Sequence, residues 1–278
     1  MISEAGISGV EITKEKYKNE KDYEFIATPD YESNDPLERY YQQRKVSFVC
    51  GAIKEIMKEN PEELVDLGCG EGIFLDAARK FNQQISTIGV DLSRRNCKKT
   101  AKKHDAICGD VEFLPFKTNS IDVVFLLDVL EHLFEHNVLS EIYRILKDDG
   151  DLLLSTPNKF GIYEHKQLVY AEDLCQNPQD IWNTLKGKPR NYAPYHVRLY
   201  SNKKLTQVLQ DHGFLILEST TEGFCFPFLG SVNNFFSAFK KEYVLEERIR
   251  RYLEIFEKKL EVFNFLIIVH ARKNSKKG

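Results

Sequence analysis

The sequence has little of several features that mark other classes of protein. Among its 278 residues, no apolar run approaches the ~20 residues that span a bilayer. Its 39 basic side chains are outnumbered by 42 acidic ones, for a net charge of -3, whereas duplex-binding proteins usually carry a basic surface. We therefore expect no transmembrane segment and a small-molecule partner rather than nucleic acid.

Paired cysteines are also missing. The six cysteines, at positions 50, 69, 97, 108, 175 and 225, form no C-x-x-C pair, so neither a zinc ribbon nor a redox dithiol is indicated. The N-terminus turns charged within fifteen residues and does not resemble a signal peptide. Unpaired cysteines without a leader predict a reducing, cytoplasmic location.

What the chain does have is an alternation of short apolar runs and helical patterns. Residues 1–36 are interpreted as an N-terminal arm, and 37–278 as one domain that opens with a helix over 37–58. The pattern then predicts strands at 63–67, 85–90, 106–108, 121–127, 151–155, 214–219 and 262–271, helices at 73–80, 94–103, 138–146 and 201–211, and a turn at 147–150. This order is typical of βαβ units in a parallel sheet with helices on both faces.

Two segments interrupt the alternation, at about 159–200 and 222–259. They are too long for idle connections in a compact domain, and insertions of this kind often serve as lids or binding loops. The second one carries a phenylalanine cluster between 224 and 239. That cluster is either core or, if exposed, a surface for an apolar acceptor or a transient membrane contact.

A glycine turn follows the first predicted strand: Val65-Asp66-Leu67-Gly68-Cys69-Gly70-Glu71-Gly72. Glycines there let the backbone approach a ligand, and the next helix offers free N–H donors. A purely structural turn is the alternative. The third glycine comes one position too early for the dinucleotide pattern G-x-G-x-x-G.

Carboxylates follow the next three strands, at the edge where open α/β sheets bind ligands. Asp91 is placed to accept the hydroxyls of a ribose, although it is also a candidate helix cap, a role that Ser93 could fill instead. Asp110 is placed to receive an adenine amino group with Val111 against the ring, although a plain turn is nearly as well supported. Asp128 follows the strongest strand.

The series of motifs resembles the class I S-adenosylmethionine-dependent methyltransferases, and most of all the small-molecule branch with the ubiquinone- and menaquinone-pathway enzymes. The resemblance is dense over 62–158 and weaker beyond 195. It rests on the glycine turn together with Gly89-Val90-Asp91-Leu92-Ser93, Gly109-Asp110 before Leu114-Pro115-Phe116, Asp128-Val129-Leu130-Glu131-His132, Leu146-Lys147-Asp148-Asp149-Gly150 and Ser155-Thr156-Pro157-Asn158.

The resemblance implies a Rossmann-like α/β fold with a seven-stranded, mostly parallel sheet whose last strand is antiparallel. It implies S-adenosylmethionine as the cofactor, S-adenosylhomocysteine as the product, and transfer of the methyl group to oxygen or carbon of a small acceptor, with no metal. A non-catalytic S-adenosylmethionine-binding protein and an NAD-dependent oxidoreductase are the alternatives. The implied cofactor residues are Asp66, Gly68, Cys69, Gly70, Gly72, Asp91, Leu92, Asp110, Val111, Asp128 and Val129.

Two segments that contain histidines, and the first predicted helix, supply the remaining candidate residues. His132 is either a general base for the acceptor or a structural hydrogen-bonding group. It begins a literal H-x-x-E-H sequence that ends at His136, but this segment directly follows a strand, so we do not expect zinc-protease chemistry and expect His136 to face solvent. Tyr195, His196 and Arg198 are candidate substrate residues, with a salt-bridged loop as the alternative. Tyr40 and Arg44 are placed to close over the cofactor's carboxylate.

Overall fold

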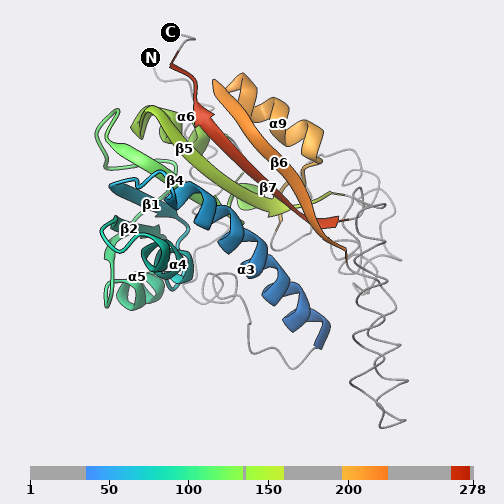
Figure 1. The fold of residues 1–278 in the computed structure, drawn as a ribbon, viewed down its shortest axis with the longest axis horizontal. Helices are drawn as coiled ribbons and strands as arrows, with labels where there is room; N and C mark the ends of the chain where they lie inside the picture. The colour runs from blue at the N-terminus through green and yellow to red at the C-terminus, as the bar shows by residue number, and fades with distance from the viewer. Residues whose placement is uncertain (1–35, 134–135, 160–195, 225–263, 276–278) are drawn as a thin grey trace.

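The structure is a computed structural model, and it describes residues 36–133, 136–159, 196–224 and 264–275. These residues form a seven-stranded sheet with helices on both faces (Figure 1). None of the described helices combines the length and apolar character needed to cross a membrane. The predicted N-terminal arm, most of both predicted insertions, and the phenylalanine cluster beyond residue 224 lie outside the described residues.

The sheet has the strand order β3-β2-β1-β4-β5-β7-β6, and β7 is antiparallel to both of its neighbours. This confirms the expected fold. The strands are β1 (Glu63–Leu67), β2 (Ser86–Asp91), β3 (Asp105–Cys108), β4 (Ile121–Leu127), β5 (Leu146–Pro157), β6 (Phe214–Phe224) and β7 (Asn264–Lys273). The helices are α3 (Pro36–Met57), α4 (Ile73–Phe81), α5 (Arg94–Thr100), η1 (Leu130–His132), α6 (Asn137–Ile145) and α9 (Asn202–Asp211).

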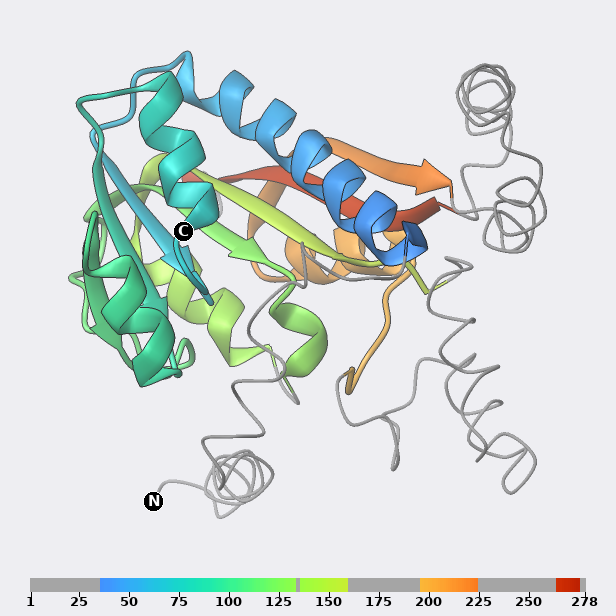
Figure 2. The same cartoon turned by 90° about the horizontal axis from the view of Figure 1, so that it is seen from below.

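The alternation of side chains along β4 explains why this strand reads as an unbroken apolar run. Val124 and Leu126 pack on one face with buried residues of α6 and α9, while Val123 and Phe125 pack on the other face with α3 and α4. Figure 2 shows these helices on opposite sides of the sheet. A strand covered on both faces carries no polar side to break the run.

The predicted and observed boundaries differ most at the start of β5 and at the end of β6. Residues 147–150 lie inside β5 rather than in a turn before it, although the register slips there, because Ile121 pairs with Leu146 and Val123 already pairs with Asp151. β6 continues into the region predicted as the second insertion, since it pairs with β7 as far as Phe224 opposite Asn264.

Candidate functional site

The glycine turn connects β1 to α4 at the carboxyl edge of the sheet, which we define as the last two residues of β1, β2, β3 and β4 together with the segments that follow these strands. Gly68, Gly70 and Gly72 have φ values of 77°, 53° and 82°, in the left-handed region that other residues rarely adopt. A Cβ on Gly68 would lie 2.3 Å from Val129 Cγ2. The turn therefore needs glycine for its own backbone and for the close approach of the segment after β4.

Asp91 connects β2 to this turn. Its Oδ2 accepts a hydrogen bond of 2.9 Å from the Gly70 N–H, and its Oδ1 accepts one of 2.7 Å from the Ser93 N–H. Ser93, not Asp91, is the N-cap residue of α5, because its side chain accepts from the Asn96 N–H. Burial raises the pKa of Asp91, and the hydrogen bonds from Ser93 and Gly70 offset part of that rise. The helix-cap alternative for Asp91 is thus wrong, and the ribose role stays a prediction.

The segment after β3 lies beside the end of β2, because the Gly109 N–H donates to the last carbonyl of that strand at 3.0 Å. Asp110 closes a local turn, in which its carbonyl accepts from the Phe113 N–H at 3.1 Å. Val111 is buried, whereas Leu92, which directly follows β2, is exposed. The structure therefore contains the plain turn that was the alternative for Asp110. The adenine-binding role of Asp110 and Val111 stays a prediction.

Asp128 follows β4 with a φ of 54°, and two side chains hold its carboxylate. Ser155 Oγ donates to Oδ1 at 2.8 Å, and Lys45 of α3 forms an ion pair with Oδ2. Lys45 was not among the sequence candidates, although its neighbour Arg44 was. The side chains of Arg44 and Tyr40 lie outside the described ones.

The side chains of Asp66 and Cys69, at the end of β1 and in the glycine turn, are buried. Asp66 is 1% exposed, and its Oδ2 has no hydrogen-bond partner among the described residues. Burial, assisted by the nearby charge of Asp91, raises the pKa of Asp66 to about 8. Cys69 is also buried, with its Sγ 3.9 Å from Thr100 Oγ1, so this side chain packs against α5.

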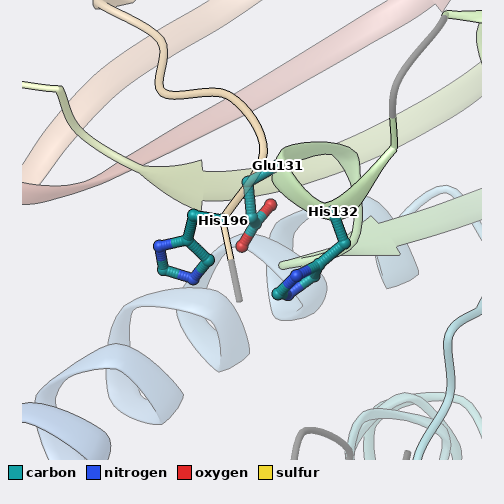
Figure 3. A group of neighbouring side chains, drawn as sticks. All are labelled: Glu131, His132 and His196. Carbon is teal, nitrogen blue, oxygen red and sulfur yellow. The ribbon is translucent and has the colours of Figure 1, made fainter. Parts of the chain in front are cut away.

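Glu131, His132 and His196 come together from two distant segments (Figure 3). The N–H groups of Val197 and Arg198 donate to the Glu131 carbonyl at 2.8 and 3.1 Å, which fixes the returning chain against η1. The rings of His132 and His196 lie with their centroids 5.2 Å apart. The structure thus places two predicted site residues side by side, with a buried glutamate that the sequence reasoning had not singled out.

His136 does not face solvent, and that expectation was wrong. It is half-buried, and its Nε2 lies 2.7 Å from Tyr200 Oη and 2.9 Å from Arg198 Nη1. Burial, reinforced by the Arg198 charge, lowers the pKa of His136 to about 4. The guanidinium group of Arg198 thus lies against His136, and Tyr195 lies outside the described residues.

The fold and this edge define the class of the protein. Its sheet order, its antiparallel β7, and a glycine turn flanked by carboxylates at adjacent strand ends are those of a Rossmann-like methyltransferase domain. The family model for the methyltransferase domain matches residues 38–219. The chain belongs to that family.

Curated relatives agree with this assignment. An uncharacterized protein of Methanocaldococcus jannaschii is 40% identical over 103 residues, which are 37% of this chain and 44% of that protein. A probable S-adenosylmethionine-dependent methyltransferase of Mycolicibacterium smegmatis is 26% identical over 156 residues, 55% of this chain and 51% of that one. The chain thus spans about half the length of these two relatives.

Solved structures agree on the fold. A S-adenosylmethionine-dependent methyltransferase from Archaeoglobus fulgidus superimposes with a TM-score of 0.51, covering 81% of this chain and 94% of that one. The two chains are 20% identical, so this similarity establishes the fold and not the substrate.

Proposed function

We propose that this protein is a S-adenosylmethionine-dependent methyltransferase that acts on a small-molecule acceptor. The observation that carries the proposal is the carboxyl edge itself. A glycine turn with three left-handed residues lies beside three carboxylates at neighbouring strand ends, in a chain that belongs to the methyltransferase-domain family. We further propose that it belongs to the branch of class I enzymes that includes the ubiquinone- and menaquinone-pathway methyltransferases.

The residues at this edge fit the cofactor. Each carboxylate oxygen has two lone pairs, so Asp91 can accept two ribose hydroxyls while it keeps its hydrogen bonds from Gly70 and Ser93. The glycines leave the turn without side chains that would keep the methionine part of the cofactor away. Asp110 and Val111 would hold the adenine, and Asp128 and Val129 would lie beside the methionine part.

Alignment of the reactants is the main task of the protein in such a reaction. When bound, S-adenosylmethionine would supply a methyl group on a positively charged sulfur, and this sulfur is the leaving group when an acceptor lone pair attacks the methyl carbon. His132 ends η1, in the segment that follows β4, and is the predicted base for a hydroxyl proton. The described cysteines are free thiols, which supports a reducing, cytoplasmic setting.

Calorimetry with S-adenosylhomocysteine tests the cofactor assignment. We expect the wild type to bind it and Asp91→Ala to weaken binding by about 100-fold or more, since hydrogen bonds to a charged group contribute about 1.5–3 kcal/mol each. Asp105→Ala is the matched control, because Asp105 is exposed at the opposite end of β3. Equal affinity of wild type and Asp91→Ala contradicts the proposal.

Two further measurements separate the alternatives. A melting temperature that rises with NAD but not with S-adenosylhomocysteine identifies an oxidoreductase. Labelled S-adenosylmethionine incubated with fractionated cell extract should label an acceptor. If the protein binds the cofactor tightly and no fraction is labelled, it is a non-catalytic binding protein.

A further inference from the structure

The cluster of Glu131, His132 and His196 has the composition of a metal site. Each residue offers one ligand atom, and the three atoms lie within 4.8 Å of one another. Figure 3 shows the Glu131 carboxylate between the two imidazole rings. Donor atoms bound at about 2.0–2.2 Å to one ion lie roughly 3–3.5 Å apart, so closing the set requires a shift of little more than an ångström.

The state of Glu131 is a second and independent indication. The side chain is completely buried, and Thr156 Oγ donates to its Oε2 at 3.0 Å. Its other oxygen, Oε1, has no hydrogen-bond partner in the part of the chain that the structure describes. Buried charges in proteins are paired or coordinate metals, so this oxygen lacks the partner that a cation would provide.

The nearest described lysine does not fill that place. Lys45 is close enough for its charge to lower the pKa of Glu131, after burial and the charge of His196 have acted on it. Its ammonium group, however, is in an ion pair with Asp128. Glu131 therefore shares the charge of Lys45 with Asp128, and its Oε1 still has no hydrogen-bond partner among the described residues.

We propose that Glu131, His132 and His196 bind one divalent transition-metal ion, for which Zn²⁺ is the best match. Two imidazoles and one carboxylate suit zinc and its neighbours in the first transition row better than Mg²⁺ or Ca²⁺, which prefer oxygen ligands. Three protein ligands are typical of catalytic zinc sites, in which the remaining position is open to water or substrate.

The role of this metal site rests on the proposed methyltransferase function. In that function, a bound metal ion implies that the methyl acceptor is a hydroxyl compound. A metal ion lowers the pKa of an oxygen that it binds, so the hydroxyl would release its proton to solvent at neutral pH. The oxygen would then form its bond to the methyl carbon as the carbon–sulfur bond breaks. The cluster is well placed for this, because η1 directly follows Val129, whose side chain contacts the glycine turn.

This inference and the general-base hypothesis for His132 exclude each other. An imidazole nitrogen that donates its lone pair to a metal cannot accept a proton on that nitrogen. A base mechanism predicts full turnover after chelation, whereas a metal site predicts loss of turnover and its recovery when Zn²⁺ is restored.

Metal binding can be measured without any acceptor. Full-length protein freed of metal with a chelator is titrated with Zn²⁺ by calorimetry, and with Co²⁺ by visible absorption, which reports the ligand geometry. We expect one ion per chain, and at least tenfold weaker binding for Glu131→Gln and for His196→Gln. His212→Gln is the matched control, because His212 is also half-buried and near a second histidine, His136, with ring centroids 5.9 Å apart.

Two controls distinguish loss of the metal site from unfolding and from failure of the proposed function. If Glu131→Gln unfolds, His196→Gln carries the test, because His196 lies in an irregular segment that the backbone N–H groups of Val197 and Arg198 attach to η1. The inference is overturned if the wild type binds no ion, or if His196→Gln binds it as tightly as His212→Gln does. Calorimetry of metal-free protein with S-adenosylhomocysteine tests the proposed function alone, so a protein that binds this ligand but no metal refutes only the metal site.

Discussion

At the amino edge of the sheet, near the start of β4, Asp151 lies against Arg272 and His270, whereas at the carboxyl edge Asp66 and Glu131 each keep one oxygen without a hydrogen-bond partner among the described residues. Arg272 donates to both oxygens of Asp151, at 2.8 and 3.0 Å, and His270 Nε2 lies 3.1 Å from Oδ1. All three carboxylates are buried.

The pKa values follow this difference. Burial would raise the pKa of Asp151, but contacts with His270 and Arg272 lower it overall. At the carboxyl edge burial prevails, and it raises the pKa of both Asp66 and Glu131. At the amino edge the charged groups pair with one another and stabilise the fold. At the carboxyl edge, Asp66 and Glu131 each have an oxygen that could bind a ligand, and perturbed pKa values of this kind are common at functional sites.

The largest expected effect comes from the amino edge. Arg272→Met leaves Asp151 buried without its main partner, and removing one member of such a pair costs about 3 kcal/mol of unfolding free energy. Because the pKa of Asp151 is lowered in the fold, the pair contributes above the ordinary aspartate pKa and its contribution is lost as the pH falls through the lower folded value. Urea unfolding at pH 7 and at pH 3 should show the penalty shrinking at the acidic end.

A pair at the surface is the control for this prediction. Lys58→Met removes the partner of Glu55 in an ion pair whose side chains are 61% and 63% exposed. Such pairs contribute little, about 0–1 kcal/mol. If Arg272→Met costs no more than Lys58→Met, the contrast between the two edges is wrong.

At the carboxyl edge, Gly68→Ala should cost about 2 kcal/mol, because a residue other than glycine is strained at positive φ and the new methyl group meets Val129. It should also weaken S-adenosylhomocysteine binding. Val129→Ala in the same chain should recover the steric part and leave the backbone part, as measured in a double-mutant cycle. Gly51→Ala is the control, since a Cβ there meets nothing within 4 Å and alanine favours the helix. A Gly68→Ala protein as stable as Gly51→Ala contradicts the prediction.

Asp66→Asn tests the buried carboxyl group through pH. The folded protein keeps this proton up to about pH 8, whereas the unfolded chain releases it near the ordinary pKa of 3.8. The group therefore stabilises the fold most below about pH 4, and its contribution is lost as the pH rises toward 8. The asparagine variant lacks this dependence, so its stability relative to wild type should rise by about 1–2 kcal/mol from pH 5 to 8, less than the full ~1.4 kcal/mol per unit because the site relaxes.

Parallel denaturant curves at pH 5, 6.5 and 8 provide the measurement. Asp211→Asn, on the exposed face of α9, serves as the control and should show no trend. A constant difference between wild type and Asp66→Asn across this range means that Asp66 is ionised throughout.

Much of this edge could be read from the sequence because its signals are local. β1 and β4 have the predicted bounds, since each is an apolar run that ends where glycine or aspartate begins a turn. The carboxylates of Asp91, Asp110 and Asp128 follow consecutive strands, and parallel strands bring their carboxyl ends to one edge. The fold was predictable for the same reason.

Contacts between distant segments were not predictable. Nothing near Lys45 indicates that it pairs with Asp128, because the contact depends on how α3 lies across the sheet. His196 lies beside His132 in a segment whose backbone N–H groups, from Val197 and Arg198, bind the Glu131 carbonyl. The pairing of Arg272 with Asp151 at the amino edge was not predicted at all. It depends on the register of β5 and β7, which has no sequence pattern of its own.

The smallest expected effect concerns Asp128, whose two carboxylate oxygens are held by two side chains, Ser155 and Lys45. Ser155→Ala removes the hydrogen bond to Asp128 Oδ1 and leaves the ion pair with Lys45 in place. A buried hydrogen bond to a charged group is worth about 1.5 kcal/mol, and the remaining pair should reduce the net cost to about 1 kcal/mol. Ser120→Ala, which removes an exposed hydroxyl bonded to the Lys117 carbonyl, should cost less than about 0.5 kcal/mol in the same urea titration. S-adenosylhomocysteine affinity should change by less than about threefold in both variants, since one hydrogen bond that only orients Asp128 is worth less than 1 kcal/mol to binding. A loss of affinity as large as that of Asp91→Ala would instead mean that the orientation of Asp128 limits cofactor binding, and it would move Ser155 into the site.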